Sequence, residues 1–182
     1  MLNDRTKTNY LLTKLDDDIR EQIEDALYLI SLFDKSPNNI NQSHDRAGTL
    51  NQNLNDYSFL VFPAAKAYEG FLKKIFRQIG VLPKSQFYSR QFRIGRSFNP
   101  DLPPKLRDEQ WLYDEIESVV GNNLAREMWQ IWIDGRNHIF HYFPNARYKL
   151  SLSQAKKIVN KFLEVMLTLL EKQQELSEVE TN

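Results

Sequence analysis

Apolar residues recur every three or four positions along most of this chain, the spacing that places side chains on one face of an α-helix. No stretch of useful length alternates apolar and polar residues as a half-buried β-strand does. The pattern therefore predicts an all-α fold, an antiparallel bundle of four to five long helices. In the first segment one helical face is formed by Leu12, Leu15, Ile19, Ile23, Ala26, Ile30 and Phe33.

Prolines, glycines and polar stretches separate the expected helices. Residues 36–50 (SPNNINQSHDRAGTL) are polar and include Pro37 and Gly48, which predicts a loop. The second helical pattern covers about residues 57–79, and Pro63 within it implies that the helix either starts near this proline or is kinked there.

Two further helical patterns occupy the C-terminal part of the chain. One starts at Asp108, continues past Gly121 to Ile139 and is ended by Pro144. The last opens with Ser151 followed three residues later by a glutamine, which is a capping-box pattern.

The composition narrows the class of protein. A length of 182 residues favours a single domain spanning residues 1–182. The absence of cysteine excludes disulfides, a cysteine nucleophile and thiolate metal sites, and a total of three histidines argues against a multi-histidine metal site. No apolar run approaches the ~18 residues of a membrane helix, and the N-terminus is polar. We expect a cytoplasmic protein with no membrane association and no metal or other cofactor.

The net charge of zero hides a segregation, because residues 51–107 carry ten basic and three acidic side chains. Within this part, residues 80–107 begin with Gly80 and contain five further prolines and glycines, which predict a long basic loop. A loop of this length is usually functional or disordered. Its basic residues are Lys84, Arg90, Arg93, Arg96, Lys105 and Arg107, and its interleaved rings are Phe87, Tyr88, Phe92 and Phe98. Cations for phosphates and rings for unpaired bases indicate a surface for single-stranded RNA. The alternative is a solvated loop whose rings pack on the helices.

Residues 136–141 (RNHIFH) combine an arginine, an asparagine and two histidines near the end of an expected helix. At about 100° per residue, Asn137 and His141 nearly stack, whereas Arg136 is ~140° from His141. Either the long Arg136 side chain bends round, or a second copy across a two-fold axis completes the site. The second arrangement predicts a homodimer.

One histidine and one arginine without metal ligands suit RNA cleavage by the neighbouring ribose 2′-OH. The histidine transfers protons near neutral pH, and the guanidinium stabilises the charge that builds on the phosphoryl oxygens. No metal is needed, because the nucleophile belongs to the substrate.

Residues 136–141 resemble the R-X4-6-H motif of HEPN ribonucleases, with the polar residue that the motif favours after the arginine. Residues 56–70 (DYSFLVFPAAKAYEG) are further similar to the HEPN domain of RnlA/LsoA-type (RNase LS) toxins. The resemblance covers about residues 53–170, and residues 1–50, an expected N-terminal helix and polar loop, are not matched. The resemblance implies an all-α bundle that works as a homodimer with the motif at the joint cleft.

The resemblance also implies roles for five residues. His141 would act as general base or acid and Arg136 would stabilise the transition state, while Asn137, Glu69 and Asp56 would position these groups and the RNA. The products would be a 2′,3′-cyclic phosphate and a 5′-hydroxyl, and a cognate antitoxin would restrain the activity, as in toxin–antitoxin and anti-phage systems. The alternative function is a catalytically inactive HEPN-like module that binds RNA or a partner protein.

Each of these residues also has a structural interpretation. Arg136 and His141 are also suited to interact with the negative end of a helix dipole. Asp56 is equally suited to cap a helix, and Glu69 to face solvent.

Overall fold

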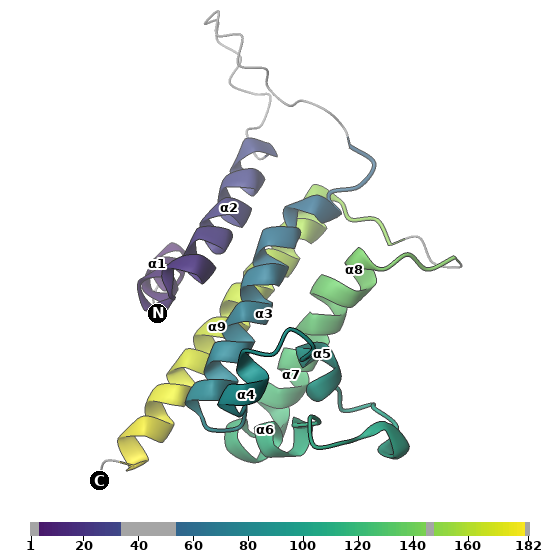
Figure 1. The fold of residues 1–182 in the computed structure, drawn as a ribbon. Coiled ribbons are helices and arrows are strands. Elements are labelled where there is room, and N and C mark those ends of the chain that lie inside the picture. The colour runs from purple at the N-terminus through teal and green to yellow at the C-terminus, as the bar shows by residue number, and fades with distance from the viewer. Residues whose placement is uncertain (1–3, 34–53, 145–147, 181–182) are drawn as a thin grey trace, which may run out of the picture.

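The computed structural model describes residues 4–33, 54–144 and 148–180, and these residues form helices and connections without any β-strand (Figure 1). The predicted all-α fold class is confirmed. The polar loop expected at 36–50 lies outside the described residues.

The first helical pattern forms two helices, so the expectation of one helix is wrong. Helix α1 spans Asp4–Lys14 and α2 spans Asp17–Phe33. Three consecutive aspartates cause the break: the Asp16 carbonyl accepts hydrogen bonds from the amides of Ile19 and Arg20, and Asp17 and Asp18 occupy the first turn of α2, where acidic side chains are favourable. The apolar face continues across the break, since Leu11, Leu15 and Ile19 are all buried.

Pro63 lies in the first turn of α3 (Phe62–Gln78), so the helix starts near this proline and is not kinked by it. A proline is tolerated at such a position because the first amides of a helix have no intrahelical partner. A short 3₁₀ helix, Ser58–Leu60, precedes α3.

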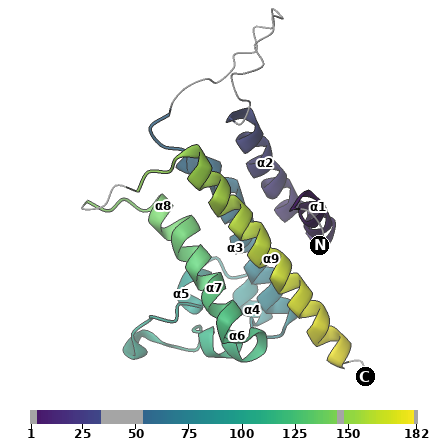
Figure 2. The ribbon, with the colours of Figure 1, turned by 180° about the vertical axis from the view of Figure 1, so that it is seen from behind.

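Helices α3 and α9 (Leu152–Glu180) lie in the middle of the fold, with α2 along one side and α7 (Asn122–Trp132) along the other (Figures 1 and 2). Helices α2 and α7 run in the direction opposite to α3 and α9 (Figure 1). The interior between them is closed by large side chains: the ring of Tyr68 packs 4.8 Å from that of Phe162, and its hydroxyl donates a hydrogen bond to the carbonyl of Met128.

Residues 80–107 are ordered and contain three short helices. They are α4 (Lys84–Phe87), α5 (Ile94–Ser97) and a 3₁₀ turn, Pro104–Leu106. Phe92 and Phe98 are buried, and Phe98 packs edge-to-face against Trp129 and Trp132. The expectation that both rings are available to stack on bases is therefore wrong, because the helices have already buried them. Of the four rings, Tyr88 remains 72% exposed.

The third helical region is interrupted twice. Helix α6 (Tyr113–Val120) ends at Gly121, whose φ of +89° favours glycine, and α7 starts directly after it. Helix α7 then passes into a π-helical turn, Ile133–Asn137, which is followed by the short α8 (His138–Phe140).

Helix α9 begins with the predicted capping box. The Gln154 amide donates to Ser151 Oγ at 3.3 Å, and the Ser151 amide donates to Gln154 Oε1 at 2.8 Å. None of the helices in the described part of the chain has the length and apolar character that crossing a membrane requires.

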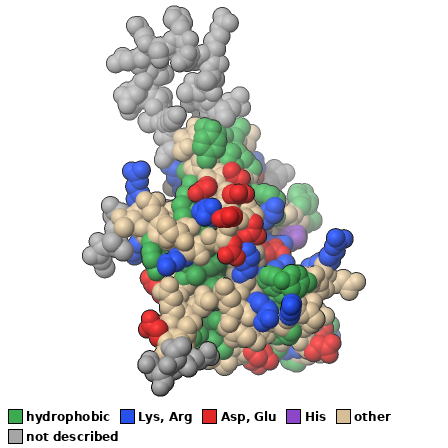
Figure 3. Space-filling view, turned by 60° about the vertical axis from the view of Figure 1, so that its left-hand side comes forward, with side chains coloured by type: hydrophobic (Ala, Val, Ile, Leu, Met, Phe, Trp, Pro, Cys, Tyr) green, Lys and Arg blue, Asp and Glu red, His purple; other side chains and the backbone are tan. Residues whose placement is uncertain are grey.

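Ion pairs join the helices at the surface. The ammonium of Lys74 on α3 lies 2.6 Å from a carboxylate oxygen of Asp16 and 2.6 Å from one of Asp18, which ties α3 to the start of α2. Figure 3 shows Lys and Arg side chains beside Asp and Glu side chains on one face of the molecule.

Candidate active site

Glu69 on α3 joins two cations at the centre of the candidate site. Its Oε2 lies 3.3 Å from Nη2 of Arg136, and its Oε1 lies 3.1 Å from Nζ of Lys73, one turn further along α3. All three side chains are half-buried. The structure thus brings together the candidate residues Glu69 and Arg136, so that one carboxylate orients the guanidinium.

Arg136 also packs on an aromatic ring. Its guanidinium carbon lies 4.6 Å from the centre of the Trp132 ring, a cation–π distance, and Oδ1 of Asn137 lies 3.5 Å from its Nη1. With a carboxylate on one side and an indole beneath, the guanidinium is held at a fixed place in the fold.

A pocket of about 170 Å³ opens beside this guanidinium. The first wall comes from the start of α5, the second from the end of α7 and its π-helical turn, and Glu69 of α3 completes it. The lining residues are Glu69, Arg93, Ile94, Gly95, Arg96, Trp132, Arg136 and Asn137. The predicted basic segment and the predicted motif thus meet at one pocket.

Two glycines allow this close packing. A Cβ on Gly95 would lie 2.5 Å from the Trp132 ring, and a Cβ on Gly135 would lie 2.4 Å from the Phe162 ring. Neither distance is sterically possible without a shift. The π-helical turn therefore rests directly on α9, with Arg136 on the pocket side, and such turns occur frequently at functional sites.

His141 is the first residue after α8, the short helix that follows the π-helical turn. Helix α8 ends at Phe140, and His141 is exposed and has extended backbone angles, φ −106° and ψ 137°. The ~140° offset expected from Arg136 assumed a helix that continues through His141, so that value does not apply. His141 does not line the pocket of Arg136.

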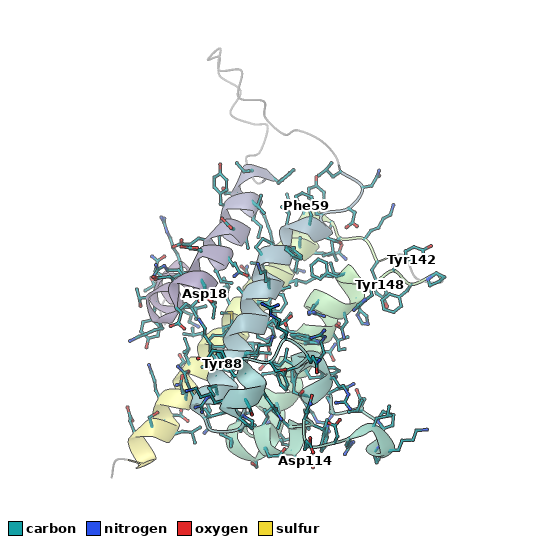
Figure 4. The ribbon with its side chains drawn as sticks, in the orientation of Figure 1. Asp18, Phe59, Tyr88, Asp114, Tyr142 and Tyr148 are labelled. Carbon is teal, nitrogen blue, oxygen red and sulfur yellow. The ribbon has the colours of Figure 1, made fainter. Side chains whose placement is uncertain are left out.

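Aromatic side chains lie close to His138, and one of them, Phe143, also lies near His141. The Phe143 ring lies 6.5 Å from His141, 6.4 Å from His138 and 5.7 Å from Tyr148. The His138 ring stacks on Tyr148 at 4.8 Å with an interplanar angle of 1°, and its Nδ1 lies 3.5 Å from Asp134. Tyr142 and Tyr148 project beyond the end of α8 (Figure 4).

Asp56 lies in a different place and has a different set of partners. Its Oδ1 accepts hydrogen bonds from the Ser58 amide at 2.9 Å, the Ser58 hydroxyl at 2.6 Å and the Leu150 amide at 3.1 Å. Burial raises the pKa of this carboxyl, but the hydrogen bonds from Ser58 and Leu150 outweigh it and hold the pKa below its usual value. Asp56 does not line the Arg136 pocket, and it joins the start of the α3 segment to the start of the α9 segment.

The six predicted RNA-binding cations divide into two groups. Lys84, Arg90 and Lys105 are exposed, and Arg93 has no carboxylate at ion-pair distance among the residues that the structure describes. Its Nη1 donates to the carbonyls of Arg90 and Phe92.

The remaining two cations hold the segment 80–107 together. Arg96 donates to both carboxylate oxygens of Asp108, at 3.1 and 2.9 Å, and to the Leu106 carbonyl. Arg107 donates to the carbonyls of Leu102 and Pro100, and its guanidinium carbon lies 4.0 Å from the centre of the Trp111 ring. Arg96 keeps its pKa above the usual value mainly through the hydrogen bond to Asp108.

Sequence reasoning missed Lys73, Trp132 and Gly95 as parts of the site. Two signals were present: Lys73 follows Glu69 by four residues, and Arg136 follows Trp132 by four, so each pair lies on one helix face. Nothing in the local sequence places Gly95 against Trp132. Among residues 4–33, 54–144 and 148–180, no three histidine or acidic side chains cluster closely enough to hold a metal ion.

Comparison of this chain with protein-family models, with curated proteins and with solved structures finds no match.

Proposed function

We propose that this chain is a metal-independent endoribonuclease of the HEPN type, acting in a toxin–antitoxin or anti-phage system. The observation that carries the proposal is the anchored Arg136: Glu69 and Trp132 hold its guanidinium at the edge of a pocket that two further arginines line. An oriented guanidinium facing an open, basic pocket is suited to a phosphodiester.

The proposed reaction needs no group beyond the chain and the RNA. The ribose 2′-oxygen attacks the neighbouring phosphorus and loses its proton to a base, while the bond from phosphorus to the 5′-oxygen breaks and this oxygen gains a proton. His141 accepts or donates one of these protons, and Arg136 stabilises the charge on the phosphoryl oxygens. The products are a 2′,3′-cyclic phosphate and a 5′-hydroxyl.

The position of His141 supports a dimeric active form. His141 is outside the pocket of Arg136 in its own chain, so a second copy is required to bring a histidine to that pocket unless the segment after α8 moves. Phe62, Phe140, Tyr142 and Phe143 are exposed near this segment and offer an apolar surface for a two-fold contact. A cognate antitoxin protein would restrain such an enzyme in the cell.

The same position of His141 favours a second candidate function, RNA binding without cleavage. In that case the arginines hold RNA or a partner protein and His141 is an exposed side chain at a helix end.

Incubation of single-stranded RNA with the purified protein in excess EDTA distinguishes the two functions. We expect fragments with 2′,3′-cyclic phosphate and 5′-hydroxyl ends, at a rate that added EDTA does not change. Cleavage that disappears in EDTA and returns with Mg²⁺ or Mn²⁺ would contradict the mechanism. Intact RNA that is nevertheless bound would establish the second function.

A further inference from the structure

The pocket beside Arg136 has a surplus of positive charge. Arg93, Arg96 and Arg136 line it, and Lys73 lies behind Glu69. The acidic groups that oppose these four cations are Glu69 and Asp108, and Asp108 is paired with Arg96. Within residues 4–33, 54–144 and 148–180, two carboxylates are thus paired with these four cations, which leaves an excess of two positive charges.

The size of the pocket limits the anions that can neutralise these two positive charges. The pocket is open to solvent, and its volume of about 170 Å³ is sufficient for one phosphate group.

Arg93 supplies the uncompensated arginine. Its Nη1 is bonded to the carbonyls of Arg90 and Phe92, which hold the side chain against its own turn without neutralising it. Gly95 then allows the backbone of the same turn to approach Trp132, so that residues 93–96 and Arg136 face one space.

Glu69 divides its two carboxylate oxygens between two cations, with Oε2 beside Nη2 of Arg136 and Oε1 beside Nζ of Lys73. Because Glu69 also pairs with Lys73, it keeps a partner when a second anion contacts the fixed guanidinium of Arg136.

We propose that this pocket binds one backbone phosphate of single-stranded RNA, held between Arg93 and Arg136, and that Glu69 is the resident anion with which the phosphate competes. The assignment to RNA rests on the proposed function, whereas the binding of a phosphate group does not. Arg93 is then a substrate-binding residue of the same site, and inorganic phosphate is a competitive inhibitor.

The test measures the affinity of the full-length protein for inorganic phosphate by calorimetry, with ionic strength held constant by chloride. Arg93→Ala should weaken phosphate binding roughly tenfold or more, since it removes a charge-assisted hydrogen bond. Glu69→Gln should strengthen it, because a like charge leaves the pocket.

Two matched variants control for charge alone. Arg126→Ala removes an exposed arginine of α7 that does not line the pocket, and Glu24→Gln removes an exposed carboxylate of α2. Neither should change the affinity for phosphate beyond twofold. Equal affinities in Arg93→Ala, Glu69→Gln and both controls would overturn the proposal. Should Arg93→Ala fail to fold, the sign of the Glu69→Gln effect decides.

A second arm uses a fluorescent 2′-deoxy oligonucleotide, which cannot be cleaved. Inorganic phosphate should displace it from the wild type, and Arg93→Ala should bind it more weakly than Arg126→Ala does. An oligonucleotide that phosphate does not displace overturns the assignment to RNA. Phosphate binding with the expected order of variants, together with RNA that stays intact, would refute the ribonuclease and leave the pocket assignment in place.

Discussion

Glu69 and Arg136 are 67 positions apart in the chain, and their side chains meet at 3.3 Å across the contact between α3 and the π-helical turn. The contact joins the two segments that carry the resemblance to HEPN ribonucleases, residues 56–70 and 136–141. It gives Arg136 a fixed orientation, which is the property a group needs in order to stabilise a transition state.

The first prediction separates chemistry from binding. His141→Ala should lower the single-turnover cleavage rate at least ~10²-fold, the usual scale for general acid–base catalysis, with little change in RNA affinity. Arg136→Ala should lower the rate similarly. His138→Ala is the matched control, because the ring of this neighbouring histidine stacks on Tyr148 and its Nδ1 lies 3.5 Å from Asp134, away from the pocket of Arg136. A wild-type cleavage rate in His141→Ala would show that His141 takes no part in catalysis.

The second prediction concerns the salt dependence of RNA binding. Arg96 is bonded to Asp108 and to the Leu106 carbonyl, so it has little left to offer a phosphate. Replacing Arg90, Arg93 and Arg96 together by alanine should make the log–log salt slope shallower by about 1.4, from two lost contacts of ~0.7 each. Arg96→Ala alone should leave the slope unchanged. A shift of about 2.1 in the triple variant would show that Arg96 contacts RNA.

The third prediction compares two glycines by urea unfolding. Gly135→Ala should destabilise the protein by about 1–3 kcal/mol, because its Cβ would lie 2.4 Å from Phe162. Gly70→Ala, within α3, should be neutral or stabilising by up to ~1 kcal/mol, since its Cβ would lie 3.6 Å from Ile19 and alanine favours the helix. Equal effects of the two substitutions would mean that α9 does not pack on the π-helical turn as described.

The fourth prediction concerns pH. The folded pKa of Asp56 is below its unfolded value, so its stabilisation is fully present above about pH 4 and is lost as the pH falls through the folded pKa. Asp56→Ala should lower the free energy of unfolding by about 1–3 kcal/mol at pH 7, because three hydrogen-bond donors lose their acceptor.

The difference in unfolding free energy between Asp56→Ala and the wild type should shrink below about pH 4, as measured by unfolding at a series of pH values. Asp25→Ala, on the exposed side of α2, should show no such dependence. A loss that stays constant down to pH 2 would contradict the assigned role.

Local signals in the sequence predicted much of the helical structure. The capping box at Ser151 depends on hydrogen bonding within a few residues and was found as expected. At Pro63 the sequence allowed a helix start or a kink, and the structure has the helix start. The break between α1 and α2 was missed, because the apolar spacing continues through Leu15 while three aspartates favour a new helix start.

Features that depend on contacts between residues far apart in the sequence could not be predicted from such local signals. Phe98 and Tyr88 belong to the same basic segment, yet Phe98 is buried and Tyr88 is exposed, because Trp129 and Trp132 pack against the Phe98 ring. The motif indicated Arg136, but its ion pair with Glu69 and the pocket wall at Gly95 required the tertiary structure.

The π-helical turn at Ile133–Asn137 has the effect of an insertion of one residue in an otherwise α-helical segment. Because a π-helical turn is wider, it advances by less than the 100° per residue of an α-helix, and the four residues from Trp132 to Arg136 complete about one turn. Arg136 therefore stays on the face of Trp132 and beside Glu69 although the turn holds an extra residue. A related sequence with one residue fewer between its counterparts of Trp132 and Arg136 can place its arginine on the same face, so an alignment gap at this turn is compatible with the same site.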